Sequence, residues 1–124
     1  MKRMLACLVL AGYALLIPGC ASEPRQGLIV TRFQDIKPDE PPPPVDLFGP
    51  GEVPSAYVYG FDDQSVTLEI FDISTGEPMK KQTTYIPRGK DYYWVFSELP
   101  AGSYKAIVST GGTSREMRLF NVRR

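Results

Sequence analysis

The stretch Tyr92-Tyr93-Trp94-Val95-Phe96-Ser97-Glu98-Leu99-Pro100-Ala101-Gly102-Ser103-Tyr104 predicts an aromatic strand, a turn and the start of a second strand. Side chains alternate between the two faces of a strand, so Tyr92, Trp94 and Phe96 share one face. Trp94 is expected in the core, because one large aromatic side chain fills much of a small β-domain. Pro100 presets a turn. Tyr104 is placed for a tyrosine corner, in which a buried tyrosine bonds to nearby backbone.

Short strands with turn signals between them continue on both sides of this stretch. The segment Val66-Thr67-Leu68-Glu69-Ile70 alternates apolar and polar side chains, as a half-buried strand does. Gly111-Gly112 predicts a tight hairpin. The expected strands cover residues 56–61, 66–70, 82–86, 92–96, 103–110 and 115–122. Strands at this spacing, with no helical period, predict an all-β fold, a small antiparallel β-sandwich of immunoglobulin-like architecture, over residues 55–124.

The second half of the chain resembles the carboxypeptidase regulatory-like domains. The resemblance covers residues 66–122 and rests on a strand, the turn Ser74-Thr75-Gly76-Glu77-Pro78, the aromatic strand and Leu99-Pro100-Ala101-Gly102-Ser103-Tyr104. The chain has Arg88-Gly89-Lys90-Asp91 where the family has an acidic-Gly turn, which leaves the middle hairpin open. The resemblance implies a transthyretin-like sandwich that acts as a spacer or docking surface and not as an enzyme.

Residues 20–54 are predicted to form a lipidated N-terminus and a Pro-rich linker. Eight of the 12 prolines lie in residues 21–54, including Pro41-Pro42-Pro43-Pro44, which predicts extended polyproline II. The linker is expected to be a tether, with a Pro-rich ligand for a partner as the alternative. The β-branched segment from Gly27 to Phe33 could join the sheet, add a strand to a partner, or be ordered by local packing alone.

The N-terminus has the pattern of an export signal. Lys2 and Arg3 precede an apolar run that ends in Leu16-Ile17-Pro18-Gly19-Cys20. This ending resembles a bacterial lipobox, which implies that residues 1–19 are a cleaved lipoprotein signal peptide and that Cys20 carries diacylglycerol and a further acyl chain such as palmitate. The alternatives are a membrane-spanning anchor, for which the run is short, and an ordinary signal peptide cut after Ala21.

Two features refine the predicted anchor. Cys7 lies inside the cleaved segment, so Cys20 would be the lone exported thiol, which is unusual unless it is modified. Ala21-Ser22, rather than Asp, follows Cys20, and the resemblance to Gram-negative lipoproteins then implies release to the outer membrane, on its periplasmic face or at the cell surface. In a Gram-positive host the same lipid would hold the protein on the outer face of its only membrane.

The amino-acid composition argues against several kinds of partner, catalytic group and metal site. Removing Lys2 and Arg3 from 14 basic and 14 acidic residues leaves 12 against 14, a balance that argues against nucleic acid as a partner. The chain has no histidine, which excludes histidine-based triads and histidine-ligated zinc. Asp62-Asp63 is a tight acidic pair in a turn, and calcium would need Asp91 or Glu52 as well. We therefore predict no enzyme activity, no metal and no cofactor.

Two classes of function remain. The first is a lipid-anchored structural or docking module that binds another protein of the bacterial envelope, for example through residues 115–122. The second is a ligand-binding module, for instance for glycan, that uses exposed aromatic side chains such as Tyr57, Tyr59 or Tyr93.

Overall fold

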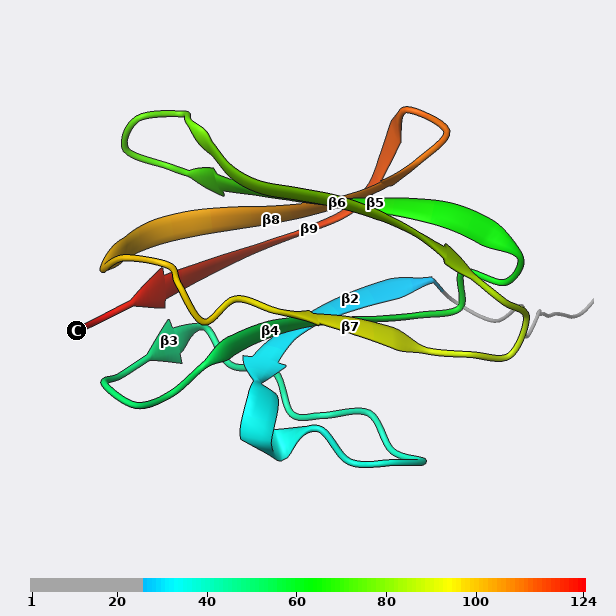
Figure 1. Ribbon diagram of the computed structural model, residues 1–124, viewed down its shortest axis with the longest axis horizontal. Helices are drawn as coiled ribbons and strands as arrows, with labels where there is room; N and C mark the ends of the chain where they lie inside the picture. The colour runs from blue at the N-terminus through cyan, green and yellow to red at the C-terminus, as the bar shows by residue number, and fades with distance from the viewer. Residues whose placement is uncertain (1–25) are drawn as a thin grey trace, which may run out of the picture.

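The computed structural model describes residues 26–124 and shows two β-sheets packed face to face (Figure 1). The three-stranded sheet has the order β2 (Gly27–Arg32), β4 (Pro54–Tyr59) and β7 (Tyr92–Val95). The five-stranded sheet has the order β3 (Leu47–Phe48), β9 (Thr113–Val122), β8 (Gly102–Thr110), β5 (Gln64–Asp72) and β6 (Pro78–Ile86). Neighbouring strands are antiparallel except β3 and β9, which run parallel. The predicted all-β sandwich is confirmed.

Strict alternation along the strands builds the core between the sheets. Val66, Leu68 and Ile70 of β5 are buried, and so are Tyr104, Ala106 and Val108 of β8, while the residues between them are half-buried or exposed. The three-stranded sheet contributes Leu28, Val30, Ala56, Val58 and Trp94 to the same cluster. Trp94 is 5% exposed, so its predicted core position is confirmed.

Two local predictions are also confirmed. Gly111 and Gly112 have φ of 57° and 81° and form the two-residue loop between Thr110 and Thr113. Such a loop needs positive φ at both central residues, which glycine adopts without steric cost. The Tyr104 hydroxyl donates to the Pro100 carbonyl at 2.6 Å, and the Tyr104 ring stacks on Phe120, which completes the tyrosine corner.

The predicted domain boundary at residue 55 is wrong, because residues 27–54, which lie within the predicted linker 20–54, fold as part of the sandwich. β2 pairs with β4 along its whole length, from Gly27 opposite Tyr59 to Arg32 opposite Pro54. Leu28 and Phe48 are fully buried. The physical reason is that this proline-rich segment carries enough apolar side chains to complete the core. The open question about residues 27–33 is answered for β2, which is an edge strand of the sandwich, with the 3₁₀ turn η1 (Phe33–Asp35) after it.

The segment from Pro43 to Phe48 joins the two sheets along one side of the sandwich. The Thr31 hydroxyl donates to the Pro43 carbonyl, and the Val45 amide donates to the Val30 carbonyl on the edge of β2. The chain then crosses to the other sheet, where Leu47 and Phe48 pair with the end of β9. Figure 1 shows β3 beside the end of β9 near the C-terminus. The segment therefore acts as a brace and not as a spacer.

The signal segment and Cys20 lie outside the described residues. Among residues 26–124, no helix has the length and apolar character needed to cross a membrane.

Candidate functional site

The outer face of the three-stranded sheet presents a row of large side chains. In the strand register Ile29 lies opposite Tyr57, and Tyr57 lies opposite Tyr93. Their neighbours in sequence, such as Leu28, Val58 and Trp94, are buried in the core. Alternation therefore turns Ile29, Tyr57 and Tyr93 away from the core.

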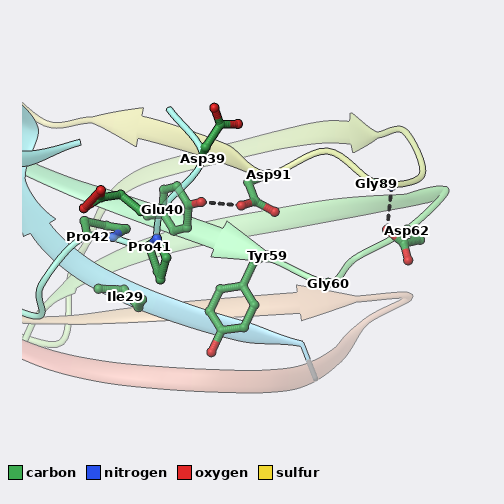
Figure 2. A pocket seen from close by; sticks show the side chains of 11 residues that line it. Ile29, Asp39, Glu40, Pro41, Pro42, Tyr59, Gly60, Asp62, Gly89 and Asp91 are labelled. Carbon is green, nitrogen blue, oxygen red and sulfur yellow. Dashed lines mark hydrogen bonds between the residues drawn. The ribbon is translucent and has the colours of Figure 1, made fainter. Parts of the chain in front are cut away.

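A groove of about 840 Å³ lies over this face. Its volume falls in the range of small-ligand sites, roughly 300–1,000 Å³. Three parts of the chain form it: the turn after η1, strands β2 and β4, and the turns beside β7 (Figure 2). The lining residues are Ile29, Asp39, Glu40, Pro41, Pro42, Tyr57, Tyr59, Gly60, Asp62, Gly89 and Asp91.

Tyr57 and Asp91 join the middle of the groove to β7. The Tyr57 hydroxyl donates a hydrogen bond to the Asp91 carboxylate. Burial, followed by this hydrogen bond and the Asp91 charge, raises the pKa of Tyr57 to about 12. Tyr57 is only 7% exposed, so its ring on the outer face of the sheet is covered by other residues and is not an open platform. The hydroxyl therefore stays protonated and holds Asp91 beside the groove.

Tyr59 occupies the end of the groove next to the start of β2. A Cβ atom built on Gly27 would lie 2.2 Å from the Tyr59 ring, which is closer than any real contact. Gly27 is thus required for the ring to lie across the edge strand. The centroids of the Tyr57 and Tyr59 rings are 6.5 Å apart, and the rings are tilted by 38°, so they do not form a flat aromatic row.

The acidic pair Asp62-Asp63 holds a turn. Asp63 accepts hydrogen bonds from the Arg88 amide, the Arg88 side chain and the Tyr85 hydroxyl, and the Arg88 amide is the main cause of the lowered pKa of Asp63. Asp62 accepts from the Gly89 amide. These bonds fix the turn through which the chain crosses from β6 to β7, where the expected family turn is absent.

Glu52 and Asp91, the residues considered as further calcium ligands, are each hydrogen-bonded to other groups of the protein. Glu52 accepts from the Gly49 amide and pairs with Arg32, and the Gly49 amide is the main cause of the lowered pKa of Glu52. Asp91 is held by Tyr57. No group of three or more potential metal ligands occurs among residues 26–124.

A second candidate surface lies on the outer face of the five-stranded sheet. We call it the apolar stripe: Leu47 of β3, Ile107 of β8, and Met117 and Leu119 of β9. Leu119 is 56% exposed, Met117 47% and Leu47 43%. Met117 lies opposite Ile107 in the register, and Leu47 lies opposite Asn121, two residues beyond Leu119. Large apolar side chains gathered on one exposed face are typical of an interaction site.

The edge of β9 beside this stripe is largely unpaired. Within the described part of the chain, β3 covers only Asn121 and Val122 on that edge. A groove of about 450 Å³ opens next to it, lined in part by Leu28, Val45 and Leu119. The sequence prediction that residues 115–122 form a half-exposed strand agrees with this arrangement.

The structure brings together only some of the residues singled out in the sequence. Tyr57, Tyr59, Asp62 and Asp91 share the groove, whereas Tyr93 lies beside Phe33, with ring centroids 6.1 Å apart. Sequence reasoning missed the wall from Asp39 to Pro42. The signal available was an acidic pair placed directly before a proline run. Comparison with protein-family models and with curated proteins found no match.

Proposed function

We propose that this protein is a lipoprotein held in the bacterial outer membrane by lipid on Cys20, and that its non-catalytic sandwich docks another protein of the envelope. The anchor rests on the basic start, the apolar run and the lipobox-like ending at Gly19-Cys20. The docking role rests on the apolar stripe beside the unpaired edge of β9. That combination is the observation that carries the proposal.

An open strand edge and an adjacent apolar face support docking in complementary ways. Within residues 26–124, the part of the β9 edge that β3 leaves uncovered offers backbone N–H and C=O groups to an added strand. Met117 and Leu119 offer apolar area that would be removed from water at the same contact. Backbone pairing and side-chain burial would then act on the same partner.

The position of β2 gives the proposed anchor a geometric consequence. Only seven residue steps separate Cys20 from Gly27, where the sandwich begins. A fully extended chain of that length spans at most about 25 Å. A lipid on Cys20 would therefore hold the sandwich close to the membrane surface, and the partner would be reached there.

Glycan binding is the weaker candidate. Sugar rings stack best on open, flat aromatic faces, but Tyr57 is buried and tilted against Tyr59. The exposed pair Phe33 and Tyr93 is the remaining feature that favours it.

Site-specific photocrosslinking in living cells tests the docking proposal. A photoreactive phenylalanine analogue is placed at position 117 or 119, and at Tyr85 as a matched control. Tyr85 is 57% exposed and lies on β6, at the other edge of the same sheet. We expect one protein adduct of defined mass from positions 117 and 119 and none from position 85. Equal adducts at all three positions, or only copies of this chain crosslinked to each other, would contradict the proposal.

A further inference from the structure

We infer that the groove on the three-stranded sheet is a separate binding site for a basic, extended peptide segment of a partner protein. It lies on the opposite sheet from the apolar stripe, so the inference does not depend on docking at β9. Groove shape, side-chain chemistry and charge each support it.

The charges that line the groove all have one sign. Among residues 26–124, the charged lining residues are Asp39, Glu40, Asp62 and Asp91, while Lys37 and Lys90 line the adjoining hollow that shares Asp39 and Asp91. None of the four forms an ion pair with a side chain of residues 26–124. The whole mature chain is nearly neutral, so this concentration is local. Charge complementarity therefore selects a cationic occupant.

The rest of the groove suits an occupant with apolar stems or side chains. Ile29 and Tyr59 come from β2 and β4, and Pro41 and Pro42 form the facing wall. In the view of Figure 2, the carboxylates of Asp39, Asp91 and Asp62 lie on one side of the groove, and Ile29 and Tyr59 lie on the other. Arginine and lysine side chains suit this arrangement, because their methylene stems pack on apolar surface while their charged end groups pair with carboxylates. A half-buried tyrosine ring also attracts such cations through its face.

The spread of the carboxylates favours a peptide over a single small cation. They come from three separate parts of the chain, the turn at Asp39 and Glu40, the turn at Asp62, and Asp91 before β7. The groove volume, about 840 Å³, is large enough for several residues. An extended segment with two or more basic side chains would meet several carboxylates at once.

Fluorescence anisotropy with the full chain, purified in a non-ionic detergent, tests the inference. The probe is a labelled short peptide of alternating arginine and valine, and the matched peptide has glutamine in place of arginine. We expect the arginine peptide to bind in low salt and to weaken as salt screens the charges. The glutamine peptide should bind poorly.

Two conservative variants locate the binding. Asp39→Asn and Glu40→Gln each remove a charge from the wall, and asparagine also tolerates the φ of 67° at position 39. Each should weaken the arginine peptide about two- to fivefold, the range for a partly exposed charge pair. Glu77→Gln is the control, because Glu77 lies in the exposed turn before β6, outside the groove.

Several results would overturn the inference. If Glu77→Gln weakened binding of the arginine peptide as much as the groove variants do, the peptide would be attracted only by the overall charge of the protein. Spermine binding as tightly as the peptide would indicate a small-cation site. Binding of the glutamine peptide, or of a neutral chitin oligosaccharide with no loss in Asp39→Asn, would indicate an apolar or glycan site. Absence of arginine-peptide binding at millimolar concentration would also refute it.

Discussion

Phe48→Ala tests whether the Pro-rich segment is part of the folded core. Phe48 is fully buried in β3, and its ring meets Phe120 edge to face at 5.8 Å. Deleting a buried phenylalanine side chain typically costs about 3–5 kcal/mol, and the aromatic pair contributes to that loss. For a domain of this size, such a loss lowers the melting temperature by about 12–40 °C. We expect this change to leave little folded protein at physiological temperature.

The neighbouring residue supplies the control. Leu47 lies in the same two-residue strand but is 43% exposed, so Leu47→Ala should cost less than about 1 kcal/mol. Unfolding in guanidinium chloride can be followed by the fluorescence of Trp94, the one tryptophan in the chain. If both variants lose the same small stability, β3 is not a core element of the sandwich.

Three further predictions follow from single residues. Trp94→Ala should lose about 3 kcal/mol by chemical denaturation, near the low end for a large aromatic, because the buried indole N–H has no hydrogen-bond partner among residues 26–124 to lose. Tyr57→Phe should lose about 1 kcal/mol at pH 7. Since the pKa of Tyr57 is raised from its ordinary 10 to about 12, the wild type should be more stable than this variant below pH 10 and lose that advantage as the pH rises to 12. Cys20→Ala should abolish incorporation of labelled palmitate in cells, while Cys7→Ala should retain it; label in the Cys20→Ala protein would refute the anchor.

The C-terminal half of the fold could be predicted because its signals are local. Alternation in residues 66–70 and the paired glycines at 111 and 112 each specify structure within a few residues. Tyr104 bonds only four residues back, to Pro100, which is also within local reach.

The N-terminal part of the sandwich could not be predicted, because the contacts that form it join residues far apart in the sequence. β3 has only two residues, too few for a period, and its partner strand is at the far end of the chain. The prolines favoured a tether by composition, yet Pro42 and Pro54 are buried. Their burial depends on β2 pairing with β4, which no local pattern specifies.

The groove on the three-stranded sheet could be predicted only in part. Tyr57 and Tyr59 were recognised as candidates from their aromatic rings, but their surroundings come from distant segments. Asp39 and Asp91 reach one groove only after β2 and β7 both pair with β4.

The docking role is tested most directly by placing a charge in the apolar stripe and measuring contact in living cells. The photoreactive residue stays at position 117, and Leu119→Glu is compared with Thr83→Glu, which lies on exposed β6 of the same sheet. A carboxylate forced into an apolar contact should reduce the yield of the protein adduct at least about tenfold. We predict that loss for Leu119→Glu and no change for Thr83→Glu, with both proteins still folded and membrane-bound. An unchanged adduct yield in Leu119→Glu would contradict docking through this face.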